Sequence, residues 1–122
     1  MAKSVNDSVL DGAFDILDQA DIMTACSAEP TTRTEAVTTY ALADAAMTPN
    51  TDYTKANGDT SGRKVTVAAK STITVDSSGT ATHIALCDGS NLLYVTTCTS
   101  QALTSGNTVN FPAWDVEILD PS

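Results

Sequence analysis

The sequence predicts a mainly β protein of the α+β class, with a β-sandwich or barrel-like antiparallel core and one N-terminal helix. Strand-like runs in its second half recur about every eight to twelve residues between glycine-containing turns, which is the spacing of sandwiches and barrels. Charged residues make up only 17% of the chain, and threonine and serine fill much of the remaining polar surface. Threonine is β-branched and suits a pleated strand better than a helix.

The length and composition indicate one folded domain. The chain has 122 residues, of which 42% are hydrophobic, enough to bury a core without disulfides or metals. We therefore expect a single domain over residues 1–122, with the helix at about 6–19 and the β core at about 21–120.

Residues 6–19 are predicted to form the helix, and Asn6 or Asp7 can cap its first turn. The apolar residues recur at helical spacing and form one broad face: Val9, Leu10, Ala13, Phe14, Ile16 and Leu17. A helix with Gly12 in its middle is weak alone, so this face is expected to pack against the rest of the fold.

The opposite face of this helix carries four aspartates: Asp7, Asp11, Asp15 and Asp18. Two interpretations of this face stay open. It is either solvated or a docking face for a basic neighbour, because like charges one turn apart repel unless a partner compensates them. In the second case Asp11, Asp15 and Asp18 are candidate docking residues.

The next segments alternate between extended and polar sequence. Residues 21–27 read as a strand that ends before Pro30. Residues 31–39 form a polar connection with one helical turn, and its Arg33 and Glu35 are two further candidate docking residues.

Small residues make 40–47 compatible with a strand or a short helix, and we favour the strand. Residues 49–62 are predicted to be a long loop, because Asn57-Gly58 and Ser61-Gly62 are turn-forming pairs.

Half-exposed strands follow at 63–68 and 71–76, where valine or isoleucine alternates with threonine. The last strand is expected at 109–118, with a break or bulge at Pro112, since proline donates no hydrogen bond to a sheet.

Residues 80–98 are predicted to form a central hairpin around the turn Asp88-Gly89-Ser90-Asn91. Both arms carry apolar residues on both alternating faces, as in Ile84, Ala85, Leu86 and Cys87 and in Leu92, Leu93, Tyr94 and Val95. Such strands are covered on both faces. We expect one face to pack on the domain core, and the other, or its rim at His83 and Tyr94, to meet a neighbouring subunit.

The three cysteines are predicted to be reduced. They are odd in number and have no C-x-x-C spacing. A hairpin closed over residues 88–91 places Cys87 opposite Leu92 and Cys98 opposite Ala81, which is too far for a disulfide between Cys87 and Cys98, since the Cα atoms must lie within about 7 Å.

The charge and hydropathy of the chain exclude some partners. A net charge of −9 and a pI near 4.1 disfavour a phosphate backbone, so no nucleic-acid partner is expected. No run approaches the roughly 20 apolar residues of a membrane span, so no membrane partner is expected. The first residues lack the apolar segment of a signal peptide, which favours folding in a cytoplasm.

No pattern in the chain points to catalysis, and we expect neither enzymatic activity nor a cofactor. His83 is the single histidine and has no nucleophile motif beside it. Histidine and cysteine are too scattered for zinc. Residues 57–62 lack the spaced carboxylates and closing glutamate of a calcium loop, and Trp114 is expected to fill the core.

Five phrases carry a resemblance that covers nearly the whole chain: VNDSVLDGAFDIL, CSAEPTTRTEAVTTYALAD, GDTSGRKVTV, ATHIALCDGSNLLYVTT and VNFPAWDVEI. The chain resembles the head decoration, or capsid cement, proteins of siphovirus-type tailed bacteriophages. The resemblance implies a structural protein on the outer surface of an HK97-like capsid, assembled in the cytoplasm of the bacterial host. It also implies that the partner is the major capsid protein, whose neighbouring subunits it bridges, and that the oligomer is a homotrimer.

Two other classes of function stay open. One is a different virion part, such as a head–tail joining or tail-tube protein, because these are also small, acidic and β-rich. The other is a carbohydrate-binding β module that uses Trp114 or Tyr53 as a stacking platform.

Overall fold

The computed structural model describes residues 5–119. The elements follow in the order α1 (Asp7–Leu17), β1 (Ile22–Cys26), η1 (a π-helical segment, Glu35–Thr39), β2 (Ala41–Ala46), β3 (Tyr53–Asn57), β4 (Arg63–Val67), β5 (Lys70–Thr74), β6 (Gly79–Cys87), β7 (Leu92–Leu103), β8 (Thr108–Phe111) and β9 (Trp114–Ile118). Strands account for 50% of the structure and helices for 16%. This confirms the predicted β-rich α+β class with one main helix near the N-terminus.

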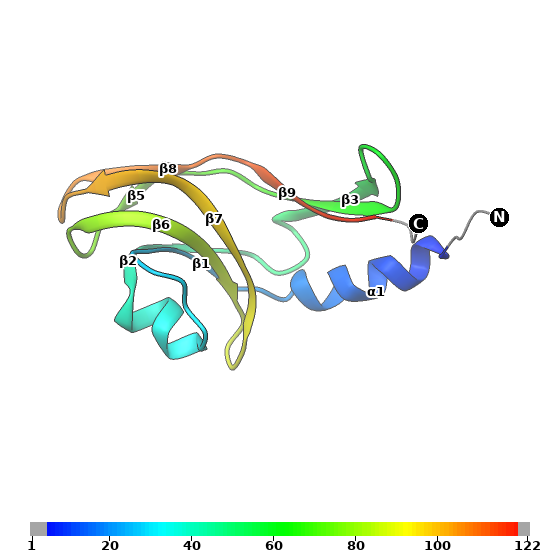
Figure 1. The fold of residues 1–122 in the computed structure, drawn as a ribbon, viewed down its shortest axis with the longest axis horizontal. Coiled ribbons are helices and arrows are strands. Elements are labelled where there is room, and N and C mark those ends of the chain that lie inside the picture. Colours follow the sequence, from blue (N-terminus) through cyan, green and yellow to red (C-terminus); the bar gives the residue numbers. More distant parts are fainter. Residues whose placement is uncertain (1–4, 120–122) are drawn as a thin grey trace.

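Three antiparallel sheets build the fold. β2, β1, β6 and β7 form a four-stranded sheet in that order, β3, β4 and β9 form a second, and β5 pairs with β8. Because β4 leads directly into β5 and β8 into β9, the second and third sheets form one long ribbon (Figure 1). The four-stranded sheet lies along one half of this ribbon, and α1 lies along the other (Figure 1).

The four-stranded sheet and the β5–β8 pair are also joined at their edges. An isolated bridge connects Ala43 of β2 to Val75, just after β5, and the Asp76 N–H donates to the Leu42 carbonyl at 2.7 Å. The strands therefore follow one another as β8, β5, β2, β1, β6 and β7 in a curved layer. β7 and β8 are the two ends of this layer.

One large hydrophobic core connects both halves of the molecule. It includes Phe14 of α1, Met23 of β1, Val65 of β4 and Leu86 of β6, each no more than 1% exposed. Each such side chain contributes roughly 1.5–3 kcal/mol by leaving water. This core fixes the ribbon, the sheet and the helix relative to one another.

The segment around η1 covers the other face of the four-stranded sheet. Cys26, Ala36, Ala85 and Cys87 form a second buried cluster there. The rim at His83 is half-exposed and stays a prediction, whereas the expected contact of the Ala85 and Cys87 face with a neighbouring subunit is wrong, because the same chain covers that face. The physical reason is that the polar connection folds back over the sheet, which strand periodicity does not reveal.

The predicted loop at 49–62 is also wrong, since it contains β3. Tyr53 lies opposite Val67, and Lys55 opposite Val65, in an antiparallel pair with β4. The glycines that suggested a loop form the turn of this hairpin: the Gly58 N–H donates to the Gly62 carbonyl at 2.9 Å, and Gly62 has a φ of +70°, which favours glycine.

The central hairpin has the predicted turn but a different register. Cys87 lies opposite Leu92 as expected, whereas a bulge between Ala81 and His83 places Ala81 opposite Gln101 rather than Cys98. All three cysteines are free. β6 lies inside the sheet and β7 at its edge, so the central position predicted for the hairpin holds for its first arm only.

Candidate docking surface

The aspartate face of α1 lies beside the β3–β4 hairpin, which shields Asp11 and Asp18, while Asp7 and Asp15 stay exposed to solvent. Arg63 Nε lies 2.9 Å from Asp11 Oδ1, and Lys55 Nζ lies 3.1 Å from Asp18 Oδ2 and also pairs with Asp15. Asp18 is only 4% exposed. The solvated aspartate face is therefore wrong for Asp11 and Asp18 and holds for the exposed Asp7 and Asp15. Asp18 is too deeply buried to meet a partner directly.

The apolar side of α1 divides into a buried stripe and an exposed one. Leu10, Phe14 and Leu17 are buried in the core. The exposed stripe, which we name the α1 ridge, consists of Val9, Ala13 and Ile16, with Val9 64% and Ile16 63% exposed.

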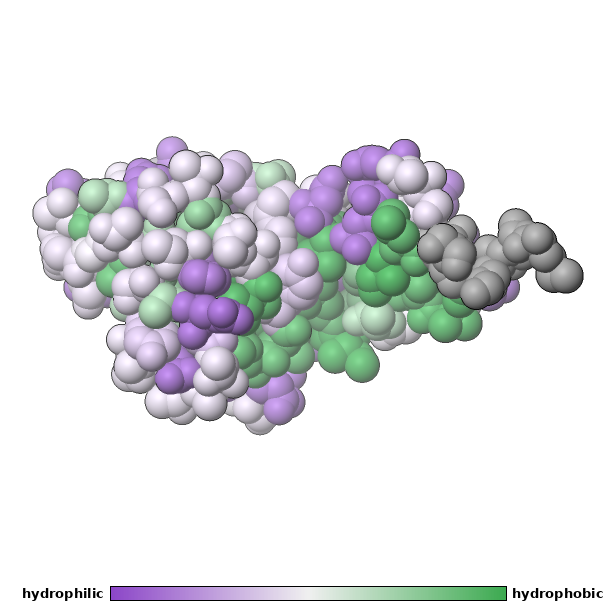
Figure 2. Space-filling model, viewed as in Figure 1, coloured by the Kyte–Doolittle hydropathy of each residue, from purple (hydrophilic) through white to green (hydrophobic). Residues whose placement is uncertain are grey.

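The α1 ridge is part of a hydrophobic area on the surface of the molecule near the helix (Figure 2). The sequence held a signal for it: the six apolar helix residues span an arc wider than the ~100° stripe that packing on one side requires.

A shallow hollow of about 260 Å³ adjoins the α1 ridge. Its walls come mainly from α1, β7 and β9, in particular from Ala13, Phe14, Leu17, Leu93, Tyr94 and Ile118. The ring of Tyr94 packs against Trp114 with 5.8 Å between centroids. Tyr94, a predicted interface residue, thus lies beside the ridge.

The other predicted interface residue lies elsewhere. His83 is opposite Thr97, and Tyr94 is opposite Leu86, so the alternation along β6 places His83 and Tyr94 on opposite faces of the hairpin. The Nδ1 atom of His83 shares a hydrogen bond with the Thr82 hydroxyl at 2.8 Å. The two residues do not form one site.

Arg33 and Glu35 organise the segment around η1, away from α1 (Figure 1). Arg33 Nε donates to the Asp88 carbonyl at 2.7 Å and so fastens this segment to the β6–β7 turn. The Thr31 backbone N–H, together with the Thr31 hydroxyl, donates to Glu35 and lowers the pKa of that carboxyl. The five predicted docking residues therefore lie in two separate places.

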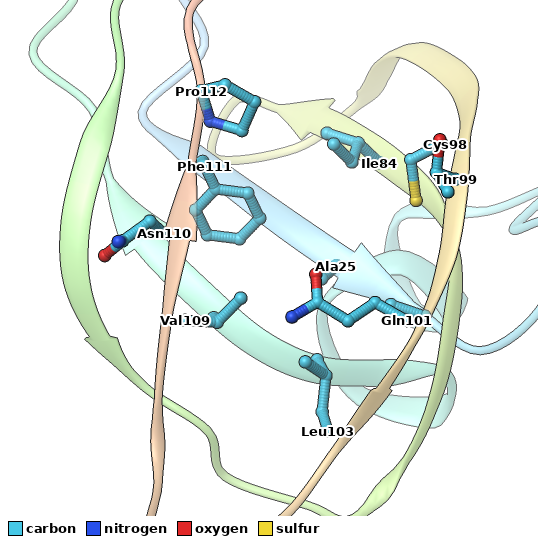
Figure 3. Close-up of a pocket in the computed structure, with 11 residues that line it drawn as sticks. Ala25, Ile84, Cys98, Thr99, Gln101, Leu103, Val109, Asn110, Phe111 and Pro112 are labelled. Atoms are coloured by element: carbon cyan, nitrogen blue, oxygen red, sulfur yellow. The ribbon is translucent and has the colours of Figure 1, made fainter.

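A pocket of about 220 Å³ opens between the two ends of the curved layer (Figure 3). We name it the β7–β8 pocket. Its walls include Ile84, Cys98, Gln101, Leu103, Val109 and Phe111, and all the residues that line it are uncharged. Burial raises the pKa of the Cys98 thiol, so this group is held as a neutral thiol. No sequence pattern pointed to this pocket.

Neither aromatic residue proposed as a sugar platform presents an open ring. Tyr53 is 5% exposed, and its hydroxyl donates to the Ala20 carbonyl at 2.9 Å. Trp114 is half-buried and packs against the large core and Tyr94. The Tyr53 platform is therefore wrong.

Over residues 5–119, the structure contains no group of three or more histidine, cysteine or acidic residues arranged to hold a metal ion. In the same described range, no helix combines the length and apolar character needed to cross a membrane. The chain has no significant match to a protein-family model, a curated protein or a solved structure.

Proposed function

We propose that this protein is a structural virion protein that decorates a tailed-phage capsid and stabilises it by bridging neighbouring major capsid subunits. The observation that carries the proposal is the α1 ridge, where two large aliphatic side chains stand 64% and 63% exposed. Contiguous exposed apolar surface on a folded protein marks a contact with another macromolecule. The virion setting comes from the resemblance of the sequence to decoration proteins.

The α1 ridge is held rigidly, as a docking surface should be. Phe14 is 1% exposed on the inner side of the helix, and Asp11 and Asp18 are paired with Arg63 and Lys55 on the β3–β4 hairpin. Preorganisation lowers the ordering cost of binding. Val9 and Ile16 can therefore enter a partner without first fixing the helix.

The binding free energy available from one α1 ridge is small. This is sufficient for a protein that binds a capsid through many copies of the same contact. Complete burial of an aliphatic side chain contributes about 1.5–3 kcal/mol, so the two ridge residues give weak attachment by themselves. Linked contacts raise the effective concentration for one another. An oligomer on a capsid lattice would thus bind far more tightly than a single chain.

The decisive experiment mixes the purified protein with expanded, undecorated heads of the phage that encodes it and sediments the heads. We expect wild-type protein to sediment with them and Ile16→Asp to stay in the supernatant. Thr74→Asp, which adds the same charge on the exposed part of β5, is the matched control and should still sediment. Wild-type protein that stays in the supernatant at micromolar concentration contradicts the proposal.

The mass of the soluble oligomer separates this function from that of a tail-tube protein. Tube proteins assemble into hexameric rings, whereas the decoration role predicts a trimer, as the resemblance implies. Sedimentation equilibrium of the free protein distinguishes the two masses. A hexamer would favour the tube.

A further inference from the structure

The outer edge of β7 is a free strand edge that lacks charged residues. β7 extends over Leu92–Leu103, and its twelve residues carry no charge, although the whole chain has a net charge of −9. Within residues 5–119 it pairs with β6 alone. Natural edge strands are commonly blunted by charge, proline or a covering element, because their unpaired N–H and C=O groups accept another strand.

β8 supplies a second free edge beside it. The two strands are joined by a short turn, in which the Asn107 N–H donates to the Thr104 carbonyl at 3.0 Å, yet they do not pair with each other. β8 is held on β5 instead: the Val75 N–H donates to the Asn107 carbonyl at 2.8 Å, and the Thr72 N–H donates to Asn110 Oδ1 at 2.8 Å. The β7–β8 hairpin is therefore splayed.

The β7–β8 pocket lies in the space that this splaying opens. Side chains of both strands line it, among them Gln101 and Leu103 of β7 and Val109 and Phe111 of β8 (Figure 3). Its floor comes from β1 and β6, through Ala25 and Ile84. The curved layer that begins at β8 and ends at β7 thus lacks a strand at this gap.

We propose that an extended peptide segment of another protein adds to the outer edge of β7 and places alternate side chains in the β7–β8 pocket. The free backbone groups of the edge specify an extended chain, and in such strand addition the pockets for alternate side chains give the specificity. The uncharged walls select aliphatic side chains and reject charged ones, since a charge buried there would have no partner. This surface is distinct from the α1 ridge, and its test requires no capsid.

The probe is a synthetic peptide in which threonine and valine alternate, with lysine at both ends for solubility. Hydrogen exchange of the protein is followed by mass spectrometry or NMR with and without this peptide. Alternate amides of β7 already bond to β6. We expect the outward-pointing amides among residues 98–103 to gain protection only with the peptide. A peptide of the same composition with proline at its centre should give no protection, because proline cannot continue the ladder.

Two lysine substitutions test the location. Gln101→Lys puts a charge in the pocket wall and should weaken peptide binding by about tenfold or more. Thr80→Lys is the matched control: Thr80 is exposed and pairs with Ala102, one rung away, and it does not line the pocket. It should bind the peptide like wild type.

Three outcomes overturn the inference: no protection of residues 98–103, equal protection in Gln101→Lys and wild type, or protection that rises with protein concentration before any peptide is added. The third outcome assigns the edge to a second copy of this chain. Thermal unfolding of both variants shows that each remains folded during the measurement.

Discussion

The two ends of the molecule share one hydrophobic core but differ in the interactions that are added to it. At the sheet end, formed by β1, β2, β6 and β7, both faces of β6 are covered by apolar residues, and Met23 and Leu86 are fully buried. At the helix end, formed by α1, β3, β4 and β9, α1 is tied to the hairpin by ion pairs, while Val9 and Ile16 stay outside. Apolar burial orders the first end, whereas at the second end ion pairs act together with the buried Leu10, Phe14 and Leu17 to set the orientation of α1.

This difference shows why a helix with a clear apolar face need not bury all of it. Lys55 and Arg63 stand on adjacent strands, where they attract the aspartates of α1. Exposed ion pairs contribute only about 0–1 kcal/mol, but Asp18 is buried and cannot be left unpaired cheaply. The helix therefore turns Asp11 and Asp18 toward the hairpin, and one apolar stripe is left exposed for a partner.

The largest expected effect contrasts the two apolar stripes of α1. Phe14→Ala should lower the free energy of unfolding by about 3–5 kcal/mol, because it opens a cavity in the core. Ile16→Ala, on the exposed ridge, should change it by no more than about 0.5 kcal/mol. Urea unfolding of both variants measures this contrast, and equal losses would show that the ridge is buried in the free protein.

A smaller effect is expected from the ion pairs at the helix end. Lys55→Met should destabilise the protein by about 1–3 kcal/mol, because it leaves the buried Asp18 carboxylate without its cation. Lys64→Met is the matched control, since its partners Asp59 and Asp115 are exposed, and it should cost less. A loss for Lys64→Met as large as that for Lys55→Met would remove the special role given to Asp18.

A pH-dependent effect is expected at the tip of the sheet end. The backbone N–H groups of Ser90 and Asn91 donate to Asp88 at 2.8 and 2.6 Å and lower its pKa. The unfolded carboxyl, with a pKa of about 3.9, then binds the proton more readily than the folded one. This contribution is present above about pH 4 and is lost as the pH falls through the folded pKa.

Asp88→Ala should therefore be less stable than wild type at pH 7, with the difference shrinking toward pH 3. Urea midpoints across that range provide the measurement. A difference that grows on acidification would contradict the assigned direction.

The last prediction concerns the reactivity of the three cysteine thiols, which depends on how tightly the sheet end is packed around them. Cys26 and Cys87 are fully buried, and burial raises the pKa of Cys87 to about 11. Cys98 is only half-buried, so it should react first with a thiol reagent in the native protein. Peptide mapping of the labelled protein identifies the site, and modification of Cys87 at the same rate would contradict the packing of η1 over the sheet.

The sequence by itself determined the elements whose signals are local. Asn6 caps α1 by accepting from the Ser8 N–H, Asp88 organises the hairpin turn, and the strand breaks at Pro112 so that its two parts join different sheets. Each of these depends on residues within a few positions of one another. Capping, turn chemistry and proline are readable at that range.

Only the tertiary structure decided which surfaces stayed exposed. The Asp15–Lys55 and Asp11–Arg63 pairs join residues 40 and 52 positions apart, and the β7–β8 pocket exists because β8 pairs with β5 instead of its neighbour in sequence. Periodicity shows that a helix or strand has an apolar face but not what will cover it. That choice depends on long-range pairing, which here left the α1 ridge and the edge of β7 uncovered by residues 5–119.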